Sequence, residues 1–201
     1  MRRIYLVRHA QSEFNEKGIF QGRLDSDLTP LGFVQARMVA RFLEREGIEA
    51  VLTSPQRRAY KTALTVGDVL GLEVEVDERL KEMSFGILEG RRFWDLLREE
   101  GSMMRSWLTD PLRNPLPTQE PVEKFEKRIL SFLEDLRARP EKRIAVIGHG
   151  GTLHGILCLT LGMGLSKLWW VHMDNTGVTL LEEGQEGFRL VYLNSLCHLR
   201  R

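Results

Sequence analysis

The first apolar segment of the chain, Ile4–Val7, ends directly in a cation and an imidazole, Arg8-His9. Four consecutive apolar residues, two of them β-branched, predict a strand that is buried on both faces of a sheet. Arg and His at the end of such a strand indicate that something there uses them, because ligands of open α/β sheets bind at the carboxyl ends of the strands. We therefore expect a nucleophile at His9, with Arg8 holding the anion that it attacks.

Apolar strands and amphipathic helices alternate through the first third of the chain. Thr29-Pro30 is typical of an N-cap followed by proline at the first helical position, and the apolar spacing continues to Gly47. A short apolar strand at Ala50–Thr53, a helix of about 57–70 and an edge strand at 73–76 follow. This order predicts right-handed crossovers and a mainly parallel sheet.

Residues of about 78–120 interrupt that alternation with short helical pieces and a stretch rich in proline, which we interpret as a small helical cap insertion. An amphipathic helix ending by Pro140, a buried strand at 143–148 and a closing hairpin within 178–194 complete the pattern. We predict an α/β fold, a three-layer α/β/α sandwich around a mainly parallel sheet, as one domain over residues 1–201.

Composition excludes several function classes. The 201 residues are 42% apolar and 28% charged, and the net charge of +1 predicts no field that would attract nucleic acid or an anionic membrane. The N-terminus lacks a signal-peptide pattern and no apolar run approaches the roughly 20 residues of a membrane span, so we expect a cytoplasmic protein. Two cysteines, Cys158 and Cys197, make no disulfide framework.

Three predicted strands end in cationic or imidazole groups: Arg8-His9, Arg57-Arg58 and His149. Parallel strands would bring these ends to one edge of the sheet, where the cations repel each other unless an anion lies between them. Phosphate suits such a pocket, because guanidinium groups match its oxygens in pairs and the helices after Arg58 and His149 add N–H donors at their N-termini.

The same residues indicate the chemistry. No Walker-type loop is present, and His149 and His154 lie on different faces of a helix, so we expect neither nucleotide hydrolysis by that route nor a bound metal or other cofactor. The remaining route is attack of a neutral imidazole on phosphorus, which forms a phosphohistidine that water hydrolyses. The leaving oxygen then needs a proton, for which Glu82 is the best-placed donor, with Glu78 and Glu89 as alternatives.

Four segments in order resemble the motifs of the histidine phosphatase superfamily, which has the phosphoglycerate mutase-like fold. They are Leu6–Asn15, Ser54–Ala63, Glu82–Gly90 and Gly148–Gly151. The resemblance implies His9 as the phosphohistidine nucleophile, Glu82 as the proton donor, and Arg8, Asn15, Arg58 and His149 as phosphate ligands. It also implies substrate contacts from Gln21, Gly22 and Gly150. One departure is Ala10 in place of the usual glycine, which is tolerable unless a positive φ is required there.

Within that resemblance, a phosphatase of the broad-specificity branch, acting on a small phosphorylated metabolite, is favoured over a mutase. A mutase needs a longer cap with extra basic residues, whereas this insertion is about 40 residues of mixed charge, with Thr118-Gln119-Glu120 where Gly-Glu-Ser is usual. A non-catalytic phosphate-binding module is the third alternative. The aromatic and Met residues of the insertion suggest a partly apolar substrate face.

Several other residues carry simpler interpretations. Arg57 is expected to be a surface residue, and His154 and His172 to be packing histidines with satisfied hydrogen bonds. His198 belongs to a tail that resembles one reaching the site in some relatives of that superfamily. The pair Trp169-Trp170 predicts either a core contact or a homodimer interface.

Overall fold

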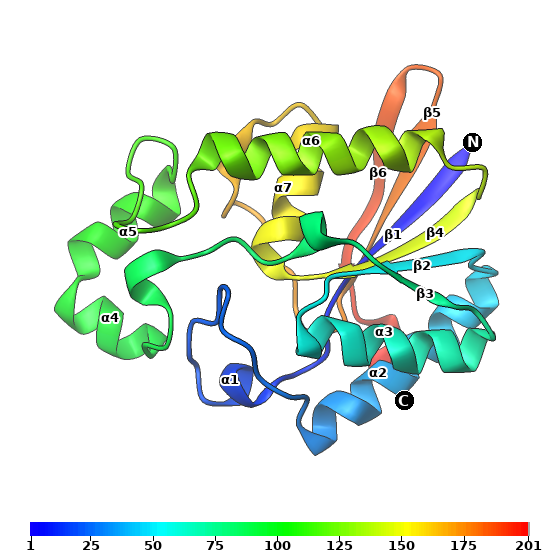
Figure 1. Cartoon of the computed structure of the whole chain (residues 1–201), viewed down its shortest axis with the longest axis horizontal. Coiled ribbons are helices and arrows are strands. Elements are labelled where there is room, and N and C mark those ends of the chain that lie inside the picture. Colours follow the sequence, from blue (N-terminus) through cyan, green and yellow to red (C-terminus); the bar gives the residue numbers. More distant parts are fainter. Residues whose placement is uncertain (201) are drawn as a thin grey trace.

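A computed structural model describes residues 1–200, and within them six strands form one sheet in the order β3-β2-β4-β1-β5-β6 (Figure 1). The strands are β1 (Arg2–Arg8), β2 (Ala50–Thr53), β3 (Val74–Val76), β4 (Arg143–Gly148), β5 (Val178–Gly184) and β6 (Gly187–Ser195). β1, β4, β2 and β3 run parallel, and the hairpin β5–β6 pairs antiparallel onto β1. The predicted mainly parallel sheet with a closing hairpin is confirmed.

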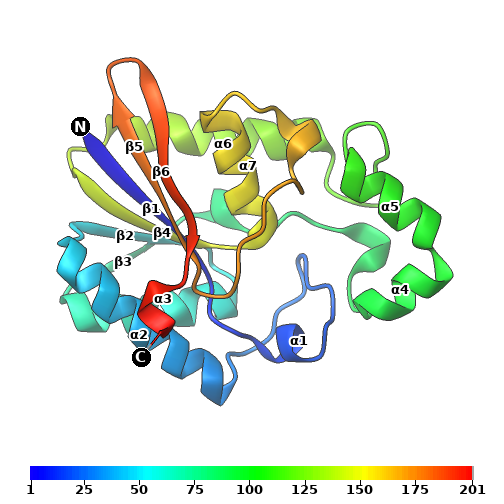
Figure 2. The same ribbon diagram turned by 180° about the vertical axis from the view of Figure 1, so that it is seen from behind.

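Helices cover both faces of the sheet, as Figure 2 shows from behind. The α-helices are α1 (Glu13–Glu16), α2 (Pro30–Glu46), α3 (Arg57–Leu70), α4 (Phe93–Glu99), α5 (Gly101–Thr109), α6 (Val122–Ala138) and α7 (Gly150–Thr160). Short 3-10 turns add η1 (Glu78–Leu80), η2 (Gly86–Leu88), η3 (Leu165–Lys167) and η4 (Cys197–Leu199).

Alternate side chains of β1 enter two separate apolar cores. Tyr5 and Val7 pack in the core that holds the apolar side chains of α2 and α3. Ile4 and Leu6 pack in the core that holds those of α6 and α7. Because successive residues of a strand point to opposite faces, one buried tetrapeptide joins both cores. This arrangement confirms the three-layer α/β/α prediction.

Local signals set the bounds of α2 where the sequence predicts them. Thr29 precedes Pro30, and its hydroxyl accepts a 3.0 Å hydrogen bond from the backbone N–H of Gly32. Gly47 ends the helix in the left-handed conformation, with φ of 64°. The long α6 likewise ends just before the predicted stop at Pro140.

The segment between β3 and α6 carries α4 and α5, which lie together at one end of the molecule, away from the β5–β6 hairpin (Figure 1). A buried ion-pair group joins this segment to the rest of the chain. Glu120 contacts Arg128 at 2.8 Å and Arg23 at 3.2 Å. Burial raises the pKa of the Glu120 carboxyl, but the two arginines outweigh burial and hold that pKa below its usual value. No helix within residues 1–200 is long and apolar enough to cross a membrane.

Candidate active site

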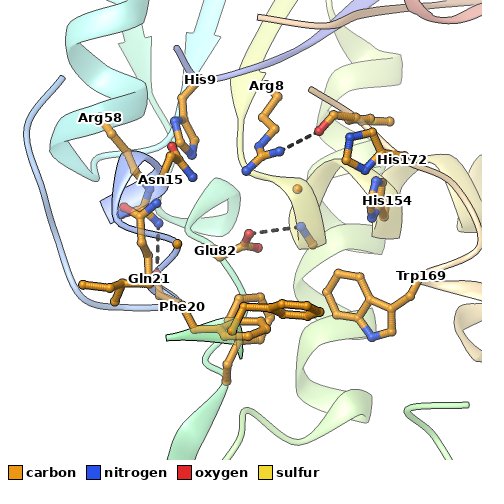
Figure 3. Close-up of a pocket in the computed structure, with 18 of the residues that line it drawn as sticks. Arg8, His9, Asn15, Phe20, Gln21, Arg58, Glu82, His154, Trp169 and His172 are labelled. Carbon is orange, nitrogen blue, oxygen red and sulfur yellow. Dashed lines mark hydrogen bonds between the residues drawn. The ribbon is translucent and has the colours of Figure 1, made fainter. Parts of the chain in front are cut away.

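The carboxyl ends of β1, β2 and β4 meet at one edge of the sheet, and a cavity of about 300 Å³ opens there (Figure 3). Parallel pairing of β1 with β4 and of β4 with β2 produces this convergence, as the sequence predicts. Eight of the predicted site residues line the cavity: Arg8, His9, Asn15, Gln21, Gly22, Arg58, Glu82 and Gly150. The ninth, His149, is fully buried behind them, and its ring centroid lies 5.2 Å from that of His9.

His9 is oriented by a hydrogen bond within its own turn. Its Nδ1 lies 2.8 Å from the carbonyl oxygen of Ala10, and because a carbonyl can only accept, Nδ1 carries the hydrogen. The lone pair of the neutral ring is therefore on Nε2. Burial, followed by the charges of Arg58 and Arg8, lowers the pKa of His9 well below its usual value, so the ring is neutral near pH 7.

His149 precedes the first turn of α7 and contacts the end of β2. Its Nε2 lies 2.8 Å from the hydroxyl of Ser54, and among residues 1–200 nothing accepts or donates at its Nδ1. Burial, then the charges of Arg58 and of His9, lowers the pKa of His149 well below its usual value. Donation from the Ser54 hydroxyl to Nε2 would place the ring hydrogen on Nδ1.

Two arginines supply the positive charge of the cavity. Arg58, 1% exposed, donates to the carbonyl oxygens of Leu24 at 2.8 Å and Gly22 at 3.0 Å, and burial lowers the pKa of its guanidinium to about 10. Arg8 donates to the carbonyl of Met173 at 2.6 Å, and burial lowers its pKa. Backbone carbonyls thus orient both guanidinium groups, and Asp25, whose Oδ1 lies 3.6 Å from Nη1 of Arg58, adds a partly exposed carboxylate beside one of them.

Glu82 lies at the start of α7 although it comes from the segment after β3. Its carboxylate accepts hydrogen bonds from the backbone N–H groups of Gly151 and Thr152, both at 3.0 Å. The N–H of Met83 donates to the same carboxylate at 2.8 Å, and the hydroxyl oxygen of Thr152, which donates to the carbonyl of Lys81, lies 3.3 Å from it. The side chain is 6% exposed and held at one position on the cavity wall.

Of the alternative donors, Glu89 serves a different purpose. It does not line the cavity, and its Oε1 accepts from the hydroxyl of Ser84 at 2.9 Å and from the N–H groups of Phe85 and Arg23 at 2.8 Å and 3.1 Å. Glu78, the other alternative, pairs with Lys81 at the surface. Glu82 is therefore the glutamate that the fold brings to the cavity.

Two amide side chains present donors to the cavity. The Oδ1 atom of Asn15 accepts from the N–H and hydroxyl of Ser12 and from the side chain of Asn175, which leaves its Nδ2 hydrogens for a ligand. The Oε1 atom of Gln21 similarly accepts from the hydroxyl of Ser26 at 2.8 Å.

Glycines allow the close approaches that this site requires. Gly22 has φ of 49°, and a Cβ there would lie 2.1 Å from Oε1 of Glu89. A Cβ on Gly151 would lie 2.7 Å from Oε1 of Glu82. Ala10, which departs from the usual motif, is fully buried and has no positive φ, so its methyl group fits.

The interpretation of His154 as a satisfied packing histidine is wrong. His154 lines the cavity, and neither ring nitrogen has a hydrogen-bond partner within the described chain. His172 also lines the cavity, where its Nε2 lies 3.0 Å from Asp174. Helical periodicity could not identify His154, because α7 is apolar on every side. His198 packs against Phe42 and Thr176 and does not line the cavity.

Aromatic side chains complete the wall of the cavity: Phe20, Phe85, Phe93, Trp107 and Trp169. We call these five residues the aromatic wall. The tryptophan pair is divided, because Trp169 belongs to this wall whereas its neighbour Trp170 is 62% exposed. Among residues 1–200, no three His, Cys, Asp or Glu side chains are grouped closely enough to hold a metal ion.

Comparison with known proteins identifies the family. The model of the histidine phosphatase superfamily (branch 1) matches residues 4–196. A Hydrogenobacter thermophilus protein named "Putative phosphoserine phosphatase 2" is 57% identical over 201 residues, covering 100% of this chain and 99% of its own. Phosphoserine phosphatase 1 of the same organism is 32% identical over 200 residues, covering 99% and 95%.

Solved structures agree with the sequence matches. A mycobacterial glucosyl-3-phosphoglycerate phosphatase in complex with VO3 superposes with a TM-score of 0.89 at 26% identity, covering 97% of this chain and 100% of that one. Fold, motif order and relatives thus coincide over almost the whole chain. The chain belongs to the histidine phosphatase superfamily and is a phosphatase.

Proposed function

We propose that this phosphatase hydrolyses small phosphomonoesters through a phosphohistidine on His9, without a metal ion. The observation that carries the proposal is the hydrogen bond from Nδ1 of His9 to the carbonyl of Ala10, which leaves Nε2 as an unprotonated nucleophile in a neutral ring. Positive charge for the phosphoryl group comes from Arg8 and Arg58, which line the same cavity.

In the first step, Nε2 of His9 forms a bond to phosphorus while the bond from phosphorus to the ester oxygen breaks. Arg8, Arg58, the Nδ2 group of Asn15 and Nδ1–H of His149 donate to the phosphoryl oxygens as negative charge shifts among them. The carboxyl group of Glu82 gives its proton to the leaving oxygen, so that a neutral alcohol departs.

In the second step, water attacks the phosphohistidine. The Glu82 carboxylate takes a proton from that water, the bond from phosphorus to Nε2 breaks, and inorganic phosphate leaves. His9 and Glu82 then hold the protons that they held at the start. Residues of about 78–120 act in this proposal as the cap of a single-domain enzyme, because the segment supplies Glu82, Phe85, Phe93 and Trp107 to the cavity wall.

Hydrolysis is favoured over mutase chemistry by the charges of the cavity. A mutase must hold a second phosphate at the end of the substrate far from His9. Within the described chain, the Arg and Lys side chains that line the cavity are Arg8 and Arg58, and we assign both to the transferred phosphoryl group.

The test is turnover of p-nitrophenyl phosphate in EDTA. We expect the wild type to hydrolyse it and His9→Ala to lose at least about a thousandfold in kcat. Single turnovers with phosphorus-32-labelled substrate, quenched with alkaline detergent, should trap a phosphoenzyme that is stable in base and labile in acid, in the wild type only. Equal rates for both proteins would overturn the assignment of His9, and loss of wild-type turnover in EDTA would overturn metal independence.

The assignment of Glu82 has its own test. Glu82→Gln keeps the shape of the side chain but cannot donate a carboxylic proton, so kcat should fall more for an alkyl phosphate than for p-nitrophenyl phosphate. An equal loss for both would exclude Glu82 as the donor. The names of the two Hydrogenobacter relatives make phosphoserine one of the alkyl phosphates to assay. A homodimer stays a prediction, which light scattering on a sizing column checks.

A further inference from the structure

The cavity has two ends of different chemistry (Figure 3). Arg8, His9, Asn15, Arg58 and Glu82 surround the space that we assign to the phosphoryl group. Figure 3 shows Phe20 and Trp169 of the aromatic wall on the other side of Glu82, where the rest of a substrate would extend. The chemistry of that second end therefore selects the leaving alcohol.

The aromatic wall is one continuous packed unit. Trp107 has its ring centroid 4.8 Å from that of Trp169 and 5.7 Å from that of Phe85, and Phe20 lies 5.9 Å from both Phe85 and Phe93. Two of these pairs, Phe20 with Phe85 and Phe85 with Trp107, are edge-to-face, a geometry that aromatic rings favour. The surface offered to a substrate is thus preformed. It favours a leaving alcohol with an apolar group over one with a strongly hydrated group.

Charged groups are scarce at this end. The Arg, Lys, Asp and Glu side chains that line the cavity within residues 1–200 are Arg8, Arg58 and Glu82, all at the phosphoryl end. His172 lies at the exposed rim beside Asp174. A carboxylate, ammonium or second phosphate on the leaving alcohol would lose its water on the aromatic wall without gaining a charged partner, which is costly.

His154 is the exception to the apolar character of this end. It comes from α7, is 6% exposed, and packs 5.8 Å from Trp169 in an edge-to-face arrangement. Both of its ring nitrogens, and Nε1 of Trp169, have no hydrogen-bond partner elsewhere in the described part of the chain. Burial lowers the pKa of His154 to about 3, so the ring is neutral near pH 7 and offers one donor and one acceptor. Buried polar groups without partners are rare in native proteins, and a ligand is one way to satisfy them.

We propose that the site accepts phosphomonoesters of uncharged alcohols that carry a ring-sized apolar body and one neutral hydroxyl or amide group. The apolar body lies on the aromatic wall, and His154 hydrogen-bonds the neutral polar group as a specificity-determining residue. This inference rests on the proposed function. It predicts that phosphomonoesters with a charged leaving alcohol, such as phosphoserine and 3-phosphoglycerate, are poor substrates.

The experiment compares alkyl phosphates, so that the leaving oxygen is chemically similar throughout. The panel contains benzyl phosphate, its three hydroxymethyl ring isomers, phosphoserine and 3-phosphoglycerate. We expect kcat/KM for benzyl phosphate to exceed that for either charged substrate at least about tenfold, and one hydroxymethyl isomer to exceed benzyl phosphate by about tenfold. A preference for phosphoserine or 3-phosphoglycerate, or three isomers no better than benzyl phosphate, would overturn the proposal.

Variants link the preference to particular residues. His154→Phe should bring the ratio between the best hydroxymethyl isomer and benzyl phosphate to about one, whereas His154→Gln, which keeps a donor and an acceptor, should retain most of it. Leu108→Lys adds a cation to the lining and should move the ratio toward 3-phosphoglycerate by about tenfold. An unchanged ratio in His154→Phe would remove His154 from the proposal. If His154→Phe fails to fold, Leu108→Lys still tests the proposal. An unchanged ratio of kcat/KM between benzyl phosphate and 3-phosphoglycerate in that variant would contradict the proposal.

The two levels of inference fail differently. Equal turnover of p-nitrophenyl phosphate by wild type and His9→Ala would defeat the proposed function, and the substrate proposal with it. Turnover that depends on His9 but favours phosphoserine would defeat the substrate proposal alone.

Discussion

Oε2 of Glu82 accepts a 3.0 Å hydrogen bond from the backbone N–H of Gly151, and the approach is open because residue 151 has no side chain. A Cβ there would lie 2.7 Å from Oε1 of Glu82 and 3.3 Å from the ring of Trp169. The first turn of α7 therefore positions the proposed proton donor, which comes from a distant part of the sequence.

Gly151→Ala should displace the Glu82 carboxylate while leaving His9 in place. Because small displacements of a catalytic group are costly, we expect kcat for an alkyl phosphate to fall about a hundredfold, and kcat for p-nitrophenyl phosphate, which needs less proton donation, to fall much less. Steady-state kinetics with both substrates checks this. Gly184→Ala, whose added methyl group meets no atom within 4 Å, is the matched control. Full activity of Gly151→Ala toward alkyl phosphates would contradict this account of Glu82.

Ser54→Ala removes the hydroxyl 2.8 Å from Nε2 of His149. Without that donor the neutral ring can move its hydrogen from Nδ1 to Nε2, so a donor to the phosphoryl group is lost. We expect kcat/KM to fall about 10- to 100-fold, whereas Ser131→Ala, whose hydroxyl contacts Arg79 at the surface, should change little. Unchanged kinetics in Ser54→Ala would mean that this tautomer of His149 is not needed.

Stability should decrease as the solution is acidified below about pH 6.5. Burial lowers the pKa of His154 to about 3 and of His198 to about 4, and lowers those of His9 and His149 well below their usual value. The unfolded chain therefore binds protons at pH 5 that the folded chain does not bind. The free energy of unfolding consequently decreases as the pH is lowered. His154 alone contributes a loss of about 2 kcal/mol between pH 6.5 and 5.

Urea denaturation at pH 7, 6 and 5 measures that slope. In His154→Gln, the fall in the free energy of unfolding between pH 6 and 5 should be smaller by about 1 kcal/mol. His172→Gln, which changes an exposed residue at the rim, is the control. Identical slopes in the wild type and His154→Gln would show that His154 is not held neutral by burial.

Thr118→Gly should stabilise the protein. Thr118 is exposed and has φ of 60°, a left-handed conformation that is unfavourable for a β-branched residue. Relief of about 1–2 kcal/mol, offset by about 0.5–1 kcal/mol of lost chain entropy, predicts a net gain of about 0.5–1 kcal/mol in the free energy of unfolding.

The same exchange elsewhere gives the opposite expectation. Thr65→Gly within α3 should lower stability by several tenths of a kcal/mol, because glycine is unfavourable inside a helix. Thermal denaturation of both variants tests the pair. A lower melting temperature for Thr118→Gly than for the wild type would show that position 118 carries no strain.

Most of the fold was predictable because its signals are local. The cap at Thr29-Pro30 and the stop at Gly47 define α2 within a few residues of sequence. The convergence of His9, Arg58 and His149 was also predictable, since parallel strands bring their carboxyl ends to one edge. These predictions depend on backbone direction and hydrogen bonding, which short stretches of sequence encode.

The second half of the cavity was not predictable in this way. Trp169 and Trp170 are neighbours in the sequence, yet one belongs to the aromatic wall and the other is 62% exposed. His154 lies in a helix that is apolar on all sides, so periodicity could not indicate which of its residues meets a cavity. Side-chain packing between distant segments decides such positions.

By itself, the sequence determined the order of strands and helices, the strand ends that carry Arg8, His9, Arg58 and His149, and thereby the chemistry that we propose. Only the tertiary structure decided which glutamate meets the cavity, that Gly151 receives it, and that His154 and the aromatic wall line the substrate end. The physical reason is the distance along the sequence between the residues that interact. Strand direction and helix termini follow from neighbouring residues, whereas the shape of the cavity depends on close packing between segments far apart in the chain.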